Sequence, residues 1–369
     1  MKLKKMDMPM NDIVLPSSAK EEWRRSISGE LVLKEQNKIN EPCMDKCEGS
    51  LHILNGIINC KTQEQFQELN TEHYEIGLKE REYLLERSPL IEVINKSVKK
   101  YYSLKLSDNN IHNLKISSTV NASTYTSIII NVTDGSPTLK IDIDARNETD
   151  ALVFIKVVSS EKSKPSLIYN IKCEEKSRIF IQNYIECKEK SDVFNHWTIK
   201  SNGHVRCETE SNILDSESNV TLNGFYYADN GKVEFMEGVN HRVKNSTSNQ
   251  LFRGILDNSG FASFQGKIRV FEGADDTNAM QSHKAICVDN KSNVYTKPEL
   301  EIFADEVICS HGATVGGLDP AALFYLGARG VDPVEAQKML LEAFAMQTTE
   351  DANETNYKLI QSNIKEVLL

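Results

Sequence analysis

The spacing of apolar residues changes twice along this chain of 369 residues. In the first hundred residues, apolar positions mostly recur at the spacing of amphipathic helices. From about Ile111 they alternate with polar positions, as in half-buried strands, and Asn, Asp, Ser and Gly separate the runs. Helical spacing returns after Asp319. The pattern predicts a mostly helical domain over residues 1–104, a β-rich core over 105–312 and a helical domain over 313–369.

Two local signals mark elements in the N-terminal segment. Thr62 and Gln65 form a capping box, which predicts a helix over Phe66 and Leu69. The dipeptide Asn55-Gly56 lies between apolar flanks and predicts a β-hairpin. The apolar residues of this segment are interpreted as local core.

The central segment consists of many short runs with strand composition. Apolar centres recur at Ile255, Ile268, Ile286 and Ile302 with unequal gaps. This spacing suits the coils of a solenoid with variable turns, although a β-sandwich also gives many short strands. His241 and Arg242 in this segment are interpreted as solvated. Four cysteines are interpreted as core or wall residues: Cys173, Cys187, Cys207 and Cys287.

The C-terminal segment has clear helix starts. Asp319 is a good N-cap and is followed by Pro320 at the first helical position. Asp332 with Glu335 predicts the start of the next helix, whose apolar residues lie on one stripe. The last predicted helix covers residues 356–369, and its apolar face is expected to pack within the chain or against a partner.

Composition excludes several classes of partner. The net charge is −10, from 43 basic and 53 acidic residues, which disfavours nucleic acid or an anionic membrane. No apolar run approaches the ~20 residues of a membrane span, and no secretory signal is recognised at the start. The eight cysteines are spread along the chain and are interpreted as reduced thiols. We therefore expect a cytoplasmic protein with no membrane or nucleic-acid partner.

Enzyme motifs are missing from the sequence. There is no Walker A loop, so we expect no nucleotide site on this chain. The dinucleotide fingerprint, the zinc-protease motif and the serine nucleophile elbow are missing too. The sequence therefore predicts a protein that is not itself an enzyme.

The candidate chemistry lies at Cys309 and His311. In an extended segment these two side chains leave the same face of the strand, and a thiolate with an imidazole suits a metal or sulfur site. They would stand some 6–7 Å apart, which is too far for a Cys-His nucleophile pair but suits shared ligation. Gly312, Gly316 and Gly317 are expected to let the backbone turn before the helices.

The run from Pro298 through Phe344 resembles the C-terminal signature of the SufB/SufD family of iron–sulfur cluster scaffold subunits. Weaker similarity occurs near Glu21, Leu51 and Asn223. The resemblance implies a right-handed parallel β-helix flanked by helical domains, which would resolve the choice between solenoid and sandwich. It implies a non-catalytic subunit that pairs with SufB and binds the SufC ATPase. It also implies that His311, with Cys309, contributes to a transient cluster shared with SufB.

Within that family the chain is more similar to the SufD branch. Ser282 stands where SufB carries a cysteine, and the segment from Cys309 to His311 differs from the corresponding segment of SufB. The residues expected to bind SufC are apolar positions of the two predicted helices: Leu323, Leu326, Met339, Leu340 and Phe344.

Two other functions remain open at this point. The chain could pair with itself, as a SufB-like scaffold or a homodimer. Parallel β-helices also act on polysaccharides through clustered carboxylates, and the pairs Asp142/Asp144 and Asp275/Asp276 are candidates for such a site. Solvated turn carboxylates account for these pairs more simply.

Overall fold

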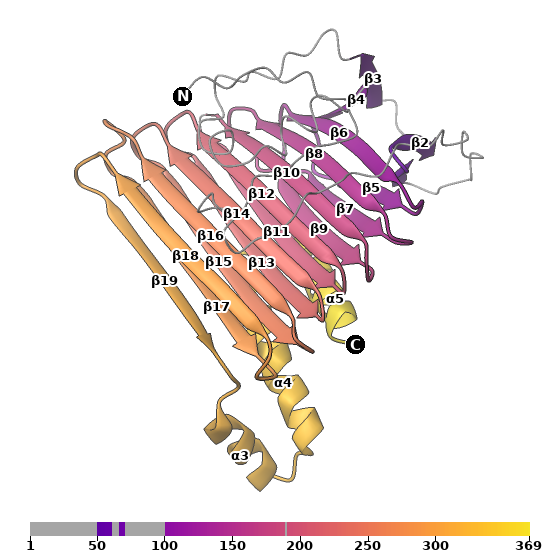
Figure 1. The fold of residues 1–369 in the computed structure, drawn as a ribbon. Helices are drawn as coiled ribbons and strands as arrows, with labels where there is room; N and C mark the ends of the chain where they lie inside the picture. The colour runs from indigo at the N-terminus through magenta and orange to yellow at the C-terminus, as the bar shows by residue number, and fades with distance from the viewer. Residues whose placement is uncertain (1–49, 61–65, 71–99, 189) are drawn as a thin grey trace, which may run out of the picture.

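The computed structural model describes residues 50–60, 66–70, 100–188 and 190–369. Within these residues the chain winds into a parallel β-helix of about eight turns, followed by three α-helices (Figure 1). The predicted fold class, mainly β with a parallel β-helix core, is confirmed. Most of the expected N-terminal helical domain lies outside the described residues. No helix in the part that is described is long and apolar enough to cross a membrane.

Two sheets form the walls of the β-helix. Sheet A contains β1 (Ser50–Leu54), β2 (Ile57–Cys60), β5 (Ile111–Ser118), β7 (Thr138–Ala145), β9 (Ser166–Cys173), β11 (Asp192–Ser201), β13 (Asn219–Asp229), β15 (Thr247–Asp257), β17 (Asn278–Cys287) and β19 (Ile308–Gly316). Sheet B contains β3 (Phe66–Asn70), β4 (Lys100–Leu106), β6 (Ser123–Val132), β8 (Asp150–Ser159), β10 (Arg178–Cys187), β12 (His204–Ile213), β14 (Lys232–His241), β16 (Phe261–Val270) and β18 (Asn293–Ile302).

From β4 to β19, each turn of the solenoid adds one strand to each sheet, and each strand pairs in parallel with the strand two positions later. Asn223 pairs with Leu251, and Leu251 with Ser282, so successive coils differ in length. This accounts for the unequal spacing in the sequence, and the parallel register excludes the antiparallel sandwich. Several turns place an Asn in the left-handed region, as at Asn230 and Asn258 with φ of 51° and 52°. Asn tolerates this conformation better than most residues.

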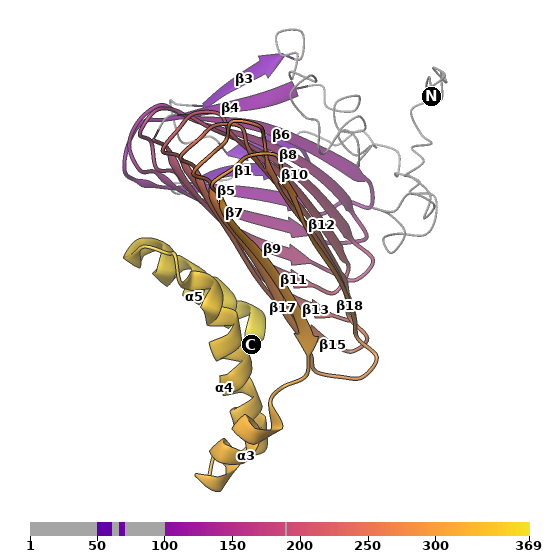
Figure 2. The same cartoon turned by 90° about the vertical axis from the view of Figure 1, so that its left-hand side faces the viewer.

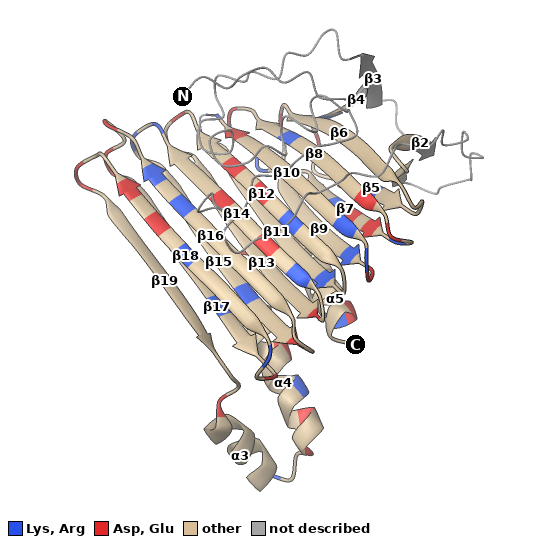
Figure 3. Ribbon diagram, in the orientation of Figure 1, with Lys and Arg blue, Asp and Glu red and all other residues tan. Residues whose placement is uncertain are grey.

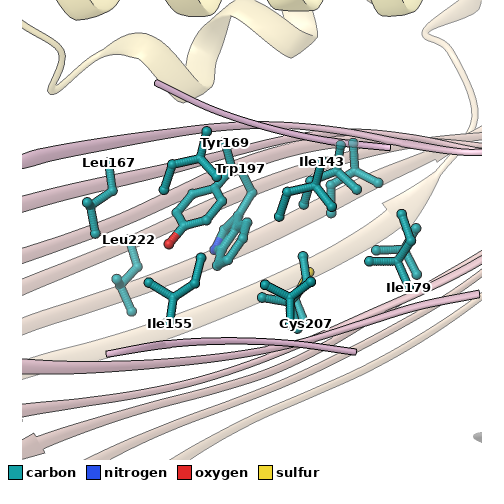
Figure 4. Close-up of a cluster of buried hydrophobic side chains, with 14 of the residues drawn as sticks. Ile143, Ile155, Leu167, Tyr169, Ile179, Trp197, Cys207 and Leu222 are labelled. Atoms are coloured by element: carbon teal, nitrogen blue, oxygen red, sulfur yellow. The ribbon is translucent and has the colours of Figure 1, made fainter. Parts of the chain in front are cut away.

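The core lies between the two sheets (Figure 4). Alternate residues of each strand point inward, and most of them are aliphatic or aromatic. Tyr169 stacks on Trp197 of the next coil, with 3.9 Å between ring centroids. Phe235 and Phe252 meet edge to face across the interior. Such aromatic contacts stabilise the packing of neighbouring strands in the β-helix.

Two local predictions in the described N-terminal pieces have different outcomes. The hairpin is confirmed: β1 pairs antiparallel with β2, and Asn55 and Gly56 have φ of 51° and 83°. The helix over Phe66 and Leu69 is wrong, because these residues belong to β3, which pairs antiparallel with β4. Pairing with a distant strand has overridden a local capping signal there.

The prediction that His241 is solvated is also wrong. Its side chain is fully buried and lies within hydrogen-bond distance of Ser246 and Ser248, at 2.7 and 2.9 Å. It follows Val239 at the strand alternation, which places it on the inward face of β14. Burial lowers the pKa of this imidazole to about 4.

The chain leaves the β-helix after β19 and forms α3 (Pro320–Ala328), α4 (Pro333–Met346), the 3-10 turn η4 (Gln347–Thr349) and α5 (Glu354–Leu368). The predicted caps are confirmed, because Asp319 accepts from the Ala321 amide and Asp332 from the Val334 amide. Figure 2 shows α5 lying along sheet A while α3 projects beyond it. The apolar face of α5 packs within the chain, on buried residues of sheet A that include Phe194 and Phe225.

Candidate functional site

The last coil of the β-helix has exposed edges. β19 ends sheet A and β18 ends sheet B, so each has one edge without a neighbouring strand among the described residues (Figure 1). Large apolar side chains are exposed there, including Ile308 at 64%, Val315 at 42% and Phe303 at 59%. Unpaired backbone groups beside exposed apolar side chains are typical of a surface that pairs with another sheet.

Cys309 and His311 lie on β19, as predicted, and two residues apart on one face of it. Cys309 is half-buried and packs against a buried cluster that includes Ile268, Val270 and Ala279, so this face is directed toward the interior of the β-helix. His311 pairs in register with the buried Gln281, yet it is exposed because no further coil of the described chain covers it. The imidazole therefore lies at the open end of the solenoid.

The thiol of Cys309 is protected rather than activated. Partial burial raises its pKa, and a hydrogen bond with the Ala279 backbone opposes that rise only in part. A neutral thiol is a weak nucleophile and becomes a ligand only when it loses its proton to a metal. Within the described residues no three His, Cys, Asp or Glu gather to hold a metal ion. By themselves, Cys309 and His311 are too few side chains for such a site.

Two of the three glycines belong to β19 and do not turn the backbone, so the expectation is wrong for them; Gly317 follows the strand. Gly312 and Gly316 belong to the strand, and neither has a positive φ. A Cβ built at either residue would meet nothing within 4 Å. Packing in the described residues therefore does not require glycine here, whereas close approach of another backbone would.

The helices α3 and α4 form a second exposed surface. α3 has no buried residue and carries no charged side chain (Figure 3). Phe324, Tyr325 and Val334 are exposed at 79%, 55% and 77%. These three residues were missed from the sequence, although a short helix that is apolar all round is itself a signal of a covered surface.

The five predicted SufC-binding residues do not share one environment. Leu323, Leu326 and Leu340 are half-buried, and Met339 is exposed at 45%. Phe344 packs with the cluster between the helices and sheet A, where the Arg253 guanidinium lies 5.9 Å from its ring centre. Phe344 therefore contributes to packing inside the chain.

The turn after Phe344 fixes the helices to sheet A. Arg253 donates a hydrogen bond of 2.7 Å to Gln347 Oε1, and His196 Nε2 lies 3.0 Å from Thr348 Oγ1. His196 is completely buried, and this burial lowers its pKa to about 3. The uncharged imidazole is part of the contact that holds the C-terminal helices in place.

Three of the four candidate carboxylates have hydrogen-bond partners of their own. On β7, Asp142 accepts from Asn170 and Asp144 accepts from Ser117, so each carboxylate has a separate cross-strand partner. Asp275 accepts a hydrogen bond from the backbone amide of Asp305. These three carboxylates thus have structural partners, although Asp142 and Asp144 lie on a strand and not in a turn.

Comparison with known proteins places this geometry in a family. A family model described as "SUF system FeS cluster assembly, SufBD core domain" matches residues 114–344, which is more than half of the chain. The chain belongs to the SufBD family. The matched range includes the last coil and most of the exposed helix pair, so both candidate surfaces are part of the family's core domain.

Individual SufBD relatives match shorter regions. The chain is 32% identical over 166 residues to "Iron-sulfur cluster assembly protein SufD" of Escherichia coli (strain K12), which covers 45% of this chain and 39% of that protein. It is 43% identical over 98 residues to a SufBD family protein of Synechocystis, covering 27% and 22%. A SufD protein of Bacillus subtilis is 31% identical over 110 residues, covering 30% and 25%. The matched regions thus span well under half of these relatives.

Proposed function

We propose that this chain is a non-catalytic scaffold subunit of a SUF-type iron–sulfur cluster assembly complex. In this proposal it pairs with a SufB-like subunit and binds a SufC-like ATPase, which hydrolyses the nucleotide. The observation that carries the proposal is the open last coil, where His311 and Cys309 lie on an unpaired edge of a SufBD core domain. The names of the relatives support the assignment to iron–sulfur assembly.

The pairing surface is the edge formed by β18 and β19. Addition of a partner strand would satisfy the unpaired backbone groups and cover Ile308 and Val315. Gly312 and Gly316 would allow the partner's backbone to come close. The cluster is cargo in this arrangement, bound between the subunits until it is transferred. A second copy of this chain could occupy the same edge when SufB is absent.

The cell compartment is proposed to be the cytoplasm. The five cysteines whose side chains are described are all free thiols. Free thiols are typical of proteins from reducing compartments.

We expect His311→Ala to lower the cluster content of the complex without unfolding the chain. An imidazole can bind iron or carry a proton, and alanine can do neither. Loss of an exposed ring should change the free energy of unfolding by less than ~1 kcal/mol. The measurement is iron and acid-labile sulfide per complex after anaerobic reconstitution, with growth of a strain that depends on this pathway as a second readout.

Thr314→Ala is the matched control, because Thr314 is exposed on the other face of the same strand. Cys309→Ser tests the neighbouring role, and thiolate ligation predicts a loss comparable to that of His311→Ala. Normal cluster content in the His311→Ala complex would remove this residue from the site. Unfolding of the His311→Ala variant would instead show that the imidazole ring is needed for the stability of the fold.

The helices α3 and α4 are proposed to bind the ATPase. Substitutions at two phenylalanines distinguish an effect on binding from an effect on folding. Phe324→Asp should abolish retention of a SufC-like protein in a pull-down while thermal unfolding is unchanged, because the ring is exposed at 79%. Phe344→Asp should lower the unfolding temperature first, since this ring packs against sheet A. Retention of the ATPase at the wild-type level by Phe324→Asp would refute the docking assignment.

Deletion of residues 319–369 is a less selective test. It would also remove α5 and uncover Ile168, Phe194 and Phe225, which the C-terminal helices now bury. Loss of binding after this deletion could therefore follow from misfolding.

A further inference from the structure

The interior of the β-helix contains polar side chains among its apolar rows. Six of them have completely or almost completely buried polar atoms with no hydrogen-bond partner: Tyr169, Trp197, Thr209, Glu237, Gln250 and Gln281. None of the six is more than 2% exposed. Tyr169 and Trp197 belong to the core cluster directly, and Glu237 lies between the core residues Phe235 and Val239 at the strand alternation.

Glu237 is the most unusual of these groups. Both of its carboxyl oxygens are buried and without a hydrogen bond of ordinary geometry. Burial raises its pKa well above the usual range, and the neighbouring Thr209 hydroxyl opposes that rise only in part. Burial therefore favours the neutral form of this acid, which can both donate and accept hydrogen bonds.

Several polar groups lie near this acid. Thr209 pairs with Glu237 in the register of β12 and β14. Glu237 lies close enough to both Cys207 and Tyr169 to influence their pKa values, which are raised mainly by burial. Figure 4 shows Tyr169 and Trp197 pointing into the space between the sheets, with Cys207 on the opposite wall. The Tyr169 hydroxyl and the Trp197 indole N–H are thus unpaired donors in the same part of the core as an unpaired acid.

The polar groups continue toward the open end. Gly266 follows Glu237 in the register of sheet B, and a Cβ there would collide with Nε2 of Gln281. The Gln281 amide therefore fills the place that a side chain of β16 would take. It donates a hydrogen bond of 2.9 Å to Gln250 Oε1. Its own Oε1 is unpaired, and the next residue in the register is the exposed His311.

We propose that the interior of the β-helix from Tyr169 to Gln281 binds a chain of ordered water molecules centred on Glu237, with its outer end beside His311. Unpaired buried polar atoms destabilise a fold, and native proteins satisfy them with ordered water that makes two to four hydrogen bonds. The six side chains supply the donors and acceptors that such waters need. Their order along the coils makes the site a row rather than a single pocket.

The water chain has a chemical consequence. Glu237 gains a route by which its proton can exchange with solvent at the last coil, although the acid itself is fully buried. The proton passes between water molecules and leaves a carboxylate only transiently, so no redox partner is needed. This inference does not depend on the proposed role in cluster assembly.

The indole of Trp197 provides the test. The sequence contains two tryptophans, and Trp23→Phe leaves only the Trp197 indole N–H in a nitrogen-15 spectrum of the full-length chain. We expect a magnetisation-transfer peak between this N–H and bound water. Glu237→Gln should retain the peak because an amide still makes hydrogen bonds, and Glu237→Leu should lose it.

If the Glu237→Leu variant does not fold, a crystal structure of the wild-type protein provides the test. A crystal structure should then show ordered water within hydrogen-bond distance of the Glu237 carboxyl and the Trp197 Nε1. No water transfer to Trp197 in the folded protein, together with a dry interior in the crystal, would overturn the proposal. Retention of the transfer peak by a folded Glu237→Leu variant would remove Glu237 from its centre.

Discussion

Acidification below pH 6.5 is expected to destabilise the folded chain steeply, because three buried histidines are uncharged in it. Burial lowers the pKa of His196 and His283 to about 3 and that of His241 to about 4, from an ordinary value of 6.5. In the unfolded chain these rings take up protons as the pH falls through 6.5. The unfolded state then binds more protons, so the folded state loses about 1.4 kcal/mol per pH unit for each histidine.

Glu237 acts in the opposite direction over part of this range. Burial raises its pKa in the folded chain, whereas the unfolded carboxyl keeps its ordinary pKa of 4.5. As the pH falls toward 4.5, this group therefore restores part of the stability that the histidines remove. The expected net change is still a loss of stability, because three histidines act against one acid.

The measurement is urea unfolding followed by circular dichroism at several pH values between 6.5 and 4.5. His241→Gln should make the dependence shallower by about 1.4 kcal/mol per pH unit. Stability that does not change over this range would show that the three imidazoles are not held neutral. Since the contact between His196 and Thr348 anchors the C-terminal helices, their release should be part of the acid transition.

Arg206→Met is expected to lower the free energy of unfolding by about 3–5 kcal/mol, since it leaves buried charges without their partner. Arg206 is 2% exposed and donates to Glu208 at 2.7 Å and to Glu234 at 2.9 Å. Glu234 also lies 3.4 Å from His204. Although burial raises the pKa of Glu234, His204 and Arg206 together lower it to about 2, so it is charged in the folded chain.

Arg146→Met is the matched control for this prediction. The Arg146 side chain is 54% exposed and lies 3.4 Å from Asp144. Exposed ion pairs contribute about 0–1 kcal/mol, so this variant should be nearly as stable as the wild type. Similar small losses in both variants, measured by urea unfolding, would show that the Arg206 network contributes no more than a surface ion pair.

The sequence predicted those features that depend on a few neighbouring residues. Asn55-Gly56 specifies its hairpin, and Asp319 and Asp332 specify their helix starts, because each acts through its own backbone. Strand alternation also placed Cys309 and His311 on one face. The helix predicted at Phe66 was wrong because this residue belongs to a strand that is determined by pairing with β4, which is distant in sequence.

The burial of polar residues could not be predicted in the same way. His241 and Glu237 interrupt the apolar alternation of β14, and polar residues in a strand normally indicate a solvated face. Only the stacking of coils reveals that this strand has neighbours on both sides and a facing sheet. The opposite error occurs at Phe324. A helix of apolar residues is expected to be buried, and only its position beyond the sheet shows that Phe324 is exposed.

The central claim is that this chain is the scaffold partner of a SufB-like subunit in cluster assembly. The most direct measurement is co-expression of the full-length chain with SufB-like and SufC-like proteins, anaerobic purification, and assay of iron, acid-labile sulfide and visible absorption. The account predicts one complex that contains all three proteins and binds an iron–sulfur cluster. If the chain binds neither protein, and the SufB–SufC complex assembles the same amount of cluster without it, the account is contradicted.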